Sequence, residues 1–218
     1  KPQVAFFEEY GSAGIAVLED VLRGIEASGA LSIADAKRGD IGSTMAGYAR
    51  AWLRDGSPLA CDALTVSPYL GVGSLDAAFD MAAENGRGLF VLARTSNPEA
   101  AALQAASGPS GTVAQSVVDE VGRRNTAVST GTPGPFGVVV GATVADPPAL
   151  GGLAGPVLMP GVGEQGGTLD DVRRIAGPAL PHTLVNVSRH VLRAGPDVDA
   201  MRAVVTELAQ TYRFGDGS

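Results

Sequence analysis

The sequence predicts an α/β fold of the (β/α)8 TIM-barrel class, with residues 1–218 forming a single domain. Strand-like and helical segments alternate along the chain, and several strand-like segments are apolar on both faces, as parallel strands covered by helices are. Polar or glycine-rich clusters follow many different strands, at the ends where barrel active sites are built. A doubly wound sheet is the alternative, and this spread of clusters favours the barrel.

Composition narrows the class of protein further. Hydrophobic residues make up 45% of the chain and charged residues 18%, which indicates an ordered globular protein. A net charge of −7 provides no general basic face, so we expect no nucleic-acid partner. The only cysteine is Cys61 and the only histidines are His182 and His190, so neither a disulfide framework nor a histidine-rich metal site is expected.

Targeting signals are not visible in the sequence. No apolar run approaches the roughly 20 residues that cross a bilayer, and no signal peptide is recognisable. We therefore expect no membrane partner and a cytoplasmic location.

Apolar runs predict strands, and apolar residues recurring every three or four positions predict helices. The helix over residues 10–28, for example, places Ile15, Leu18 and Leu22 on one side and ends at Gly29. In order, the elements expected in the first half of the chain are a strand at 1–7, a helix at 10–28, a strand at 31–37, a helix at 43–53, a strand at 61–66, a helix at 74–84 and a strand at 88–93.

The second half continues the alternation with more irregular connections. An Ala-, Ser- and Gly-rich stretch at 99–111 predicts a loop or short helix, and 129–135 predicts a turn. The remaining expected elements are a helix at 112–124, a strand at 136–140, a short helix from Asp146, a strand at 156–159, a helix at 169–175, a strand at 183–187 and a helix at 197–212. Seven strands are expected in total, whereas a barrel has eight, so one strand is missing at the start.

Charged residues are concentrated where the 31–37 strand ends. Because side chains alternate across a strand, Leu31, Ile33, Asp35 and Lys37 are expected on one face, with Asp40 three residues later. The spacing Asp-x-Lys-x-x-Asp alone is also typical of a solvated loop before a helix. Its place at the end of an apolar, inward-facing strand favours a catalytic site, since burying such charges is costly unless they pair.

A second candidate site is the glycine-rich stretch 160–167, Pro-Gly-Val-Gly-Glu-Gln-Gly-Gly, between a strand and a helix. Its glycines allow backbone N–H groups to approach a phosphate, and the helix start adds a favourable dipole. A flexible turn is the alternative interpretation. Arg189 ends the next strand, where barrels frequently bind phosphate, and an arginine can contact phosphate with two N–H groups. The combination favours a phosphate site.

Other polar or reactive residues give weaker signals. Ser96 follows the 88–93 strand and either hydrogen-bonds a ligand or closes a turn. Cys61, His182 and Met159 are expected in the core or at its rim.

Residues 35–41, Asp-Ala-Lys-Arg-Gly-Asp-Ile, together with the stretch 160–167 and Arg189, resemble the orotidine 5′-phosphate decarboxylase family. Residues 34–44 and 188–196 resemble its actinobacterial, mycobacterial-type branch in particular. The resemblance runs from Lys1 to about Tyr212.

This resemblance implies a homodimer without cofactor or metal that converts orotidine 5′-phosphate to uridine 5′-phosphate (UMP) and CO₂ in de novo pyrimidine biosynthesis. By the same resemblance Lys1, Asp35 and Lys37 form a charged chain, completed by Asp40 of the partner subunit. Lys37 protonates C6, while the two aspartates hold the lysines and disfavour the substrate carboxylate. The implied substrate-binding residues are Ser96 at the pyrimidine, Ile41 and Thr44 (Thr44 from across the dimer), and Pro160, Gly161, Val162, Gly163, Gln165, Gly166 and Arg189, of which Gln165 and Arg189 bind the phosphate.

One departure from the family pattern and two alternatives remain. The family's first strand, with an aspartate that holds the ribose hydroxyls, has no counterpart, and we expect residues upstream of Lys1 to be missing from the sequence. A magnesium-dependent sugar-phosphate lyase or epimerase of the same superfamily shares the Asp-x-Lys-x-x-Asp core, although no extra acidic pair for magnesium is visible. A non-catalytic phosphate-binding barrel would use the same glycine loop. Turnover of orotidine 5′-phosphate separates these possibilities.

Overall fold

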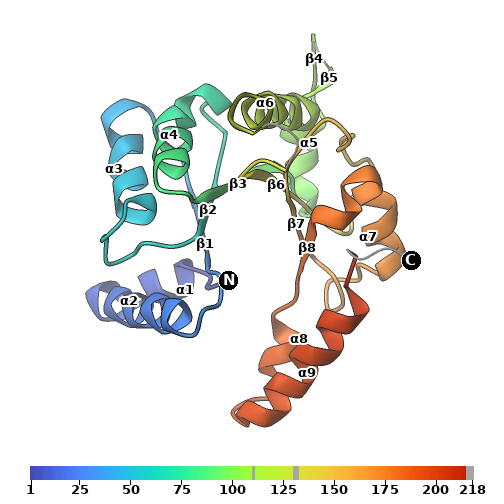
Figure 1. Ribbon diagram of the computed structural model, residues 1–218. Helices are drawn as coiled ribbons and strands as arrows, with labels where there is room; N and C mark the ends of the chain where they lie inside the picture. Colours follow the sequence, from blue (N-terminus) through green and yellow to red (C-terminus); the bar gives the residue numbers. More distant parts are fainter. Residues whose placement is uncertain (110, 130–132, 215–218) are drawn as a thin grey trace. The chain divides into compact units, whose positions relative to one another are not determined.

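The computed structural model describes residues 1–109, 111–129 and 133–214. The chain divides into two compact units, one of residues 1–92 with 135–137 and one of residues 93–134 with 138–218. Strands β3 (Gly88–Arg94) and β6 (Phe136–Val140) contribute residues to both units. The main sheet has the strand order β1-β2-β3-β6-β7-β8, and strands alternate with helices along the chain, which confirms the predicted α/β class (Figure 1).

The first unit contains three parallel strands and the helices that connect them. β2 pairs with β1 on one side and with β3 on the other, and α3 packs against α4. Apart from β3, its elements are α1 (Ala5–Glu8), α2 (Gly11–Ala27), β1 (Ile33–Arg38), α3 (Gly42–Leu53), β2 (Ala63–Val66), the 3₁₀ turn η1 (Val72–Leu75) and α4 (Asp76–Glu84).

The core of this unit follows the helical spacing of the sequence. Leu18 and Leu22 of α2 are buried, whereas Asp20 between them is exposed, as an amphipathic helix requires. Every residue of β2 is buried, as expected for a central parallel strand. The rings of Phe79 and Phe136 pack edge to face, with centroids 4.8 Å apart.

The strand predicted at residues 1–7 is wrong. Residues from Ala5 onward form α1, and only Gln3 makes an isolated parallel bridge, to Asp35. The segment is nevertheless tied to β1 by two backbone hydrogen bonds, from Val4 N to Asp35 O (3.2 Å) and from Asp35 N to Pro2 O (3.0 Å). A short apolar run fits a strand and a helix equally well, which explains the error.

The predicted alternation along the 31–37 strand is also wrong in part. β1 begins only at Ile33, so Leu31 lies outside it and is 83% exposed. The register with β2 shifts between Ala34 and Arg38, which is an irregularity of the β-bulge kind. Such a shift breaks strict alternation and re-aims the side chains that follow it.

The second unit is built around β6, β7 and β8, which pair in parallel in that order. α7 begins with a capping box formed by Thr168 and Asp171. Apart from β3 and β6, its elements are η2 (Pro98–Ala100), α5 (Ala101–Gln104), β4 (Ser107–Gly108), β5 (Gly111–Thr112), α6 (Val113–Val128), β7 (Val157–Pro160), α7 (Leu169–Ala176), η3 (Gly177–His182), β8 (Thr183–Asn186), α8 (Arg189–Leu192) and α9 (Val198–Thr211).

The local predictions in this unit have different outcomes. The stretch 99–111 contains the expected short helix, α5, and also contributes to the small antiparallel pair β4–β5, which was not predicted. No helix forms from Asp146, because each proline of Pro147-Pro148 pushes the preceding residue out of helical conformation. The predicted turn at 129–135 lies partly outside the described residues.

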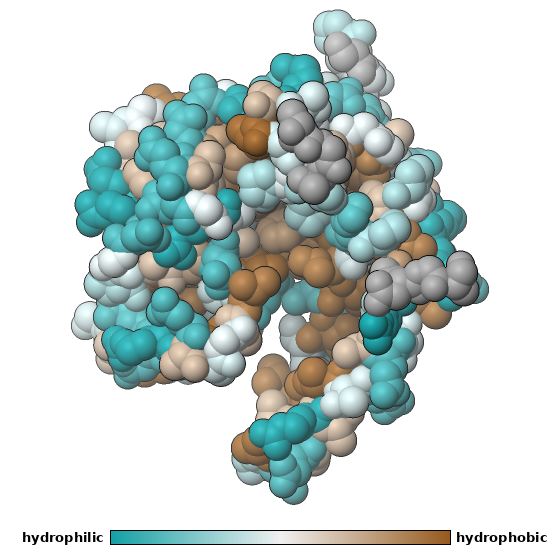
Figure 2. Space-filling model, in the orientation of Figure 1, coloured by the Kyte–Doolittle hydropathy of each residue, from teal (hydrophilic) through white to brown (hydrophobic). Residues whose placement is uncertain are grey.

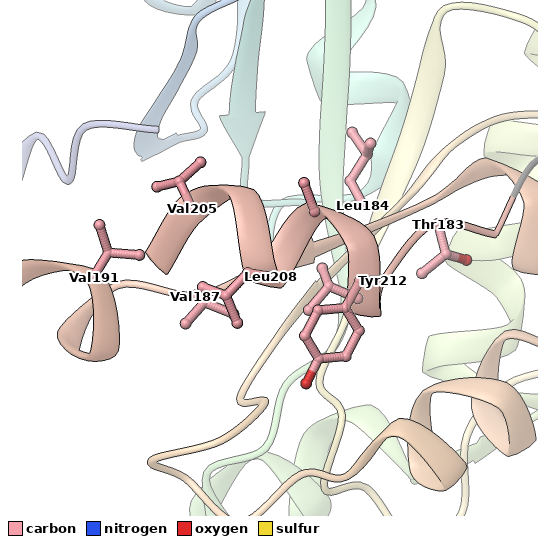
Figure 3. A pocket seen from close by; sticks show the side chains of 9 residues that line it. Thr183, Leu184, Val187, Val191, Val205, Leu208 and Tyr212 are labelled. Carbon is pink, nitrogen blue, oxygen red and sulfur yellow. The ribbon is translucent and has the colours of Figure 1, made fainter. Parts of the chain in front are cut away.

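An apolar groove of about 410 Å³ lies between β8 and α9 (Figure 3). Its lining is almost entirely aliphatic, so it offers little for catalysis. No residue of α9 is buried, although its predicted apolar side contributes Val205 and Leu208 to the groove, and apolar atoms are visible along this helix in Figure 2. The groove is lined by Thr183, Leu184, Val185, Val187, Val191, Val205, Leu208, Ala209 and Tyr212.

Across the three described ranges, no helix combines the length and apolar character that a membrane crossing requires.

Burial predicts very different effects for two leucines of the first unit. Leu18 is fully buried and Leu31 is 83% exposed. We expect Leu18→Ala to lower the free energy of unfolding by about 2–5 kcal/mol, through lost burial and a residual cavity. Leu31→Ala, the matched control, is expected to change it by less than about 0.5 kcal/mol. Urea denaturation of both variants measures this, and equal effects would contradict the placement of Leu31 outside the core.

Candidate active site

A single buried carboxylate organises the charged residues of the first unit. Asp35 lies on β1 and is 7% exposed. Its Oδ1 accepts a hydrogen bond from Lys37 Nζ at 2.6 Å, and its Oδ2 accepts one from Lys1 Nζ. The structure therefore brings together Lys1, Asp35 and Lys37, as the sequence predicted, with one anion between two cations.

Two further polar side chains contact this cluster and were missed by the sequence analysis. The Thr65 hydroxyl donates to Asp35 Oδ1 at 3.0 Å and accepts from Lys37 N at 2.9 Å. The Gln3 amide, with its nitrogen toward the carboxylate, donates to Asp35 Oδ2, and its oxygen accepts from Lys37 Nζ at 3.3 Å. Thr65 is the only polar residue of β2, but threonine is common in strands, so the signal in the sequence is weak.

The Asp35 carboxylate is held in its charged form. Burial acts to raise its pKa, but the hydrogen bonds from Lys1 and Lys37 and the charges of both lysines more than offset this. The pKa of Asp35 therefore lies below its ordinary value of 3.8.

The backbone of Lys37 adopts an uncommon conformation. Its φ is +50°, in the left-handed region that non-glycine residues rarely occupy. Such strain persists only where neighbouring groups over-determine the conformation, and it concentrates at functional sites. The Lys37 side chain is 44% exposed while that of Asp35 is 9% exposed, so the ammonium can meet a ligand and its counter-ion stays buried.

Lysine is otherwise absent from the sequence. Of the 16 lysine and arginine residues, only Lys1 and Lys37 are lysines, and both contact Asp35. Arginine keeps its proton in proteins, whereas a lysine ammonium can release one. The chain thus places its only side-chain amines together at one carboxylate.

Asp40, Ile41 and Thr44 lie next to the cluster in sequence but do not join it within the chain. Asp40 Oδ1 accepts from Ile41 N at 2.8 Å, and among the described residues its carboxylate forms no ion pair. Ile41 is 62% exposed and Thr44, in the first turn of α3, is also exposed. The assignment of these residues to a shared site across a dimer stays a prediction.

The glycine-rich stretch of the second unit forms a compact loop that is closed by its own backbone. Gly167 N donates to Gly161 O at 3.0 Å, and Gly163 N donates to Gly167 O at 2.9 Å. Gly161, Gly163 and Gly166 have φ values of +99°, +77° and +92°, which other residues adopt only with strain. The sequence of this loop therefore determines its shape directly.

A polar pocket of about 90 Å³ lies between this loop and the end of β8. This volume exceeds the ~30 Å³ share of one water molecule, so the pocket can hold a small polyatomic group. Gly163 and Gly166 shape the loop without lining the pocket. Of the predicted residues, those that line it are Pro160, Gly161, Val162, Gln165 and Arg189, and they are joined by Glu164, Asn186, Val187 and Ser188.

The start of α7 contributes less to this pocket than the sequence predicted. Thr168 Oγ1 accepts from Asp171 N at 3.1 Å, and the Asp171 carboxylate accepts from Thr168 N at 3.0 Å. The capping box thus occupies donors that an anion would use, and Asp170 and Asp171 add negative charge in the first turn. The side of the pocket opposite the glycine loop is instead formed by the turn from β8 into α8, which carries Arg189.

The remaining candidates are peripheral or structural. Ser96 is exposed after β3, and Gly141 lies so close that a Cβ there would come within 3.0 Å of Ser96 N. Cys61 is buried, and burial raises the pKa of its thiol to about 12, so it is no nucleophile. Met159 is fully buried and His182 is exposed. In the described part of the chain, no three His, Cys, Asp or Glu residues cluster to hold a metal.

Sequence comparisons place these features among known proteins. Residues 1–204 match the family model described as orotidine 5′-phosphate decarboxylase / HUMPS family. The orotidine 5′-phosphate decarboxylase of Corynebacterium efficiens is 56% identical over 214 residues, covering 97% of this chain and 76% of that protein. That of Corynebacterium glutamicum strain R is 51% identical over 214 residues, covering 97% of this chain and 77% of that protein.

Solved structures give the same result. A Streptomyces avermitilis crystal structure assigned to orotidine 5′-phosphate decarboxylase matches with a TM-score of 0.92 and 50% identity, covering 97% of this chain and 74% of that one. The Leishmania donovani OMP decarboxylase matches with a TM-score of 0.75 and 31% identity, covering 97% and 80%.

The lowered pKa of Asp35 predicts how the stability of the fold changes with pH. Because its folded-state pKa lies below 3.8, ionised Asp35 stabilises the fold above about pH 4, and this contribution is lost as the pH falls through the folded-state pKa. We expect Asp35→Asn to be less stable than wild type at pH 7, with a difference that shrinks below about pH 4.

Urea denaturation at a series of pH values measures this difference. Asp20→Asn is the control, since Asp20 belongs to an exposed pair with Arg23 and should change the stability by less than about 0.5 kcal/mol. A stability difference for Asp35→Asn that stays constant down to pH 2 would contradict the prediction.

Proposed function

The chain belongs to the orotidine 5′-phosphate decarboxylase / HUMPS family and catalyses decarboxylation of orotidine 5′-phosphate to UMP in pyrimidine biosynthesis, and we propose that Lys37 supplies the proton that replaces the leaving carboxylate. The fold of this family is the TIM barrel that the sequence predicted. The activity makes the enzyme a carboxy-lyase.

The observation that carries the proposal is the contact between Lys37 Nζ and Asp35 Oδ1 at 2.6 Å, with the lysine half exposed and the carboxylate buried. A buried anion fixes the position of the ammonium, and the exposed side of the ammonium remains available to a substrate. Pre-positioned charge of this kind stabilises a transition state because no reorganisation is needed when the reaction occurs.

The proposed reaction breaks the bond between C6 of the pyrimidine and its carboxylate carbon. CO₂ leaves, and the electron pair of the broken bond remains on C6. Lys37 donates a proton from Nζ to C6, becomes a neutral amine and regains a proton from water. Its positive charge stabilises negative charge that exists at C6 only as CO₂ departs, so the transition state gains more than the ground state.

Asp35 has a second proposed role beyond holding Lys37. Its ionised carboxylate repels the carboxylate of the substrate, and loss of CO₂ relieves this repulsion. We propose that Asp40 of the partner subunit does the same and completes the cluster in a homodimer. The exposure of Ile41 and Thr44, the partial exposure of Asp40, and the absence of an ion pair for Asp40 among the described residues support this arrangement.

We assign the substrate's phosphate to the polar pocket of the second unit. Among the residues that line it are Pro160, Gly161, Val162, Gln165 and Arg189, and Gly163 and Gly166 shape its loop. An arginine binds phosphate with two N–H groups, and the binding energy of a remote phosphate can serve catalysis elsewhere on the substrate. Ser96 is proposed to contact the pyrimidine.

Two broader proposals accompany this function. We propose that residues 1–218 act as one barrel domain, since β3 and β6 each contribute residues to both compact units. We also propose that the enzyme works in the cytoplasm without cofactor or metal, where de novo pyrimidine synthesis would supply its substrate.

Substitution of Lys37 tests the proposed proton transfer. In the presence of EDTA, wild type should remove the ultraviolet absorbance band of orotidine 5′-phosphate, whereas Lys37→Ala should reduce kcat by at least about 10³-fold. Lys37→Arg should be similarly inactive, because arginine keeps the charge but does not release its proton.

Arg23→Ala is the control for removal of a positive charge. Arg23 is exposed on α2 and forms its ion pair with Asp20, outside the charged cluster. UMP binding to Lys37→Ala, measured by calorimetry, verifies that the pocket is intact. Full activity of Lys37→Ala would overturn the role of Lys37. A wild type that is inactive in EDTA but active with magnesium would favour the sugar-phosphate lyase alternative, and binding without turnover would favour the non-catalytic one.

The glycine loop provides a separate test of phosphate binding. A Cβ at Gly167 would come within 2.6 Å of Gly161 O and 2.7 Å of Ala142 Cβ, so Gly167→Ala must displace the backbone that lines the pocket. We expect KM for orotidine 5′-phosphate to rise by about 10-fold or more, equivalent to about 1.4 kcal/mol. Gly152→Ala, where a Cβ meets nothing within 4 Å, should leave KM unchanged. An unchanged KM in both variants would contradict the assignment.

A further inference from the structure

Thr65 occupies a position that neither the sequence motif nor the family assignment explains. It lies on β2, is 1% exposed, and is the only polar side chain of that strand. A buried hydroxyl is costly unless both its donor and its acceptor capacities are used. Here both are used, and both partners belong to the charged cluster.

The Thr65 hydroxyl contacts both Asp35 and Lys37. It donates to Asp35 Oδ1 at 3.0 Å, the same oxygen that accepts from Lys37 Nζ at 2.6 Å. It also accepts from the backbone N–H of Lys37 at 2.9 Å. One hydroxyl group therefore contacts the carboxylate that orients the ammonium and the main chain that carries it.

The pairing of β1 and β2 is irregular at this point. Ala34 pairs with Leu64 and Arg38 pairs with Val66, so three residues of β1 lie opposite the single residue Thr65. Within this stretch the Lys37 N–H donates to a side chain, the Thr65 hydroxyl, at 2.9 Å. Lys37 is also the residue whose φ is +50°.

We propose that Thr65 is a positioning residue for the decarboxylation, which fixes the left-handed backbone of Lys37 and the orientation of Asp35 through its one hydroxyl. This inference rests on the proposed role of Lys37. Thr65 does not contact the reacting atoms and acts only through its two neighbours. Loss of the Thr65 hydroxyl allows the Lys37 backbone to relax from its left-handed conformation. The ammonium group then moves away from the position in which it can protonate C6.

The variants separate this role from simple stability. Thr65→Val keeps the shape of the side chain and removes the hydroxyl, whereas Thr65→Ser keeps the hydroxyl. Thr183→Val is the matched control, because Thr183 is also a buried strand threonine (7% exposed), and its hydroxyl donates to Ala179 O, away from the cluster. Lys37→Ala is assayed in parallel.

We expect Thr65→Val to lower kcat by about 10²-fold with KM changed less than about 3-fold, since a displacement near 1 Å has an effect of this size. Thr65→Ser should recover activity to within about 5-fold of wild type, and Thr183→Val should retain it. The acid limb of the kcat/KM profile should move to higher pH in Thr65→Val, because Asp35 loses a hydrogen bond that favours its charged form.

A second readout reports the hydrogen bond itself. After labelling with ¹⁵N-lysine, the 218 residues contribute lysine signals from Lys1 and Lys37 alone, and the signal that disappears in Lys37→Ala is that of the Lys37 backbone amide. Its hydrogen exchange should become about 10-fold faster in Thr65→Val, the change expected for loss of one hydrogen bond, and remain slow in Thr65→Ser and Thr183→Val.

The outcomes distinguish the two levels of inference. If Lys37→Ala is active, the proposed function fails whatever Thr65 does. If Lys37→Ala is inactive but Thr65→Val keeps its kcat, pH profile and exchange rate, the role of Thr65 alone is overturned. Equal losses in Thr65→Val and Thr65→Ser, or in Thr183→Val, would also overturn it. Should Thr65→Val not fold, Thr65→Cys replaces it, and wild-type kcat in that variant, whose thiol is a weak donor, counts against the proposal.

Discussion

The buried carboxylate of Asp35 is the constraint on which the first unit depends. A buried charge is tolerated only when it is paired and hydrogen-bonded, and this one has donors from Lys1, Lys37, Thr65 and Gln3. Its backbone is equally occupied, through the hydrogen bonds with Pro2 and Val4. The first residues of the chain, the irregular end of β1 and the middle of β2 are thus all arranged to satisfy one anion.

The two candidate binding regions achieve rigidity by different physical means. The charged cluster relies on side chains that neutralise and orient one another, and its geometry is sensitive to the loss of any of them. The glycine loop relies on its own backbone, with hydrogen bonds from Gly163 and Gly167 and three glycines at positive φ. The geometry of the charged cluster therefore depends on partners distant in sequence, whereas the shape of the glycine loop depends on local backbone contacts.

Prediction from sequence succeeded where one periodic signal determined the result. The apolar spacing of α2 and the uniformly apolar β6 leave little choice of structure, and the spacing of Asp35 and Lys37 predicted side chains that lie together, as their 2.6 Å contact confirms. It failed where a single irregularity decided the geometry. The shift between Ala34 and Arg38 cannot be seen in the sequence, and it places three residues of β1 opposite Thr65. The start of β1 at Ile33, which leaves Leu31 exposed, cannot be seen there either. The strand expected at 1–7 failed because α1 uses the same apolar residues.

The distribution of lysine has a consequence for covalent chemistry. Since Lys1 and Lys37 are the only lysines among the 218 residues and both contact Asp35, a reagent that acylates side-chain amines finds its lysine targets in this sequence only at the charged cluster. The 44% exposure of Lys37 makes it the more accessible of the two, against 14% for Lys1. Labelling these residues through lysine would therefore modify the proposed active site, and a weakly electrophilic ligand would react with Lys37 before Lys1.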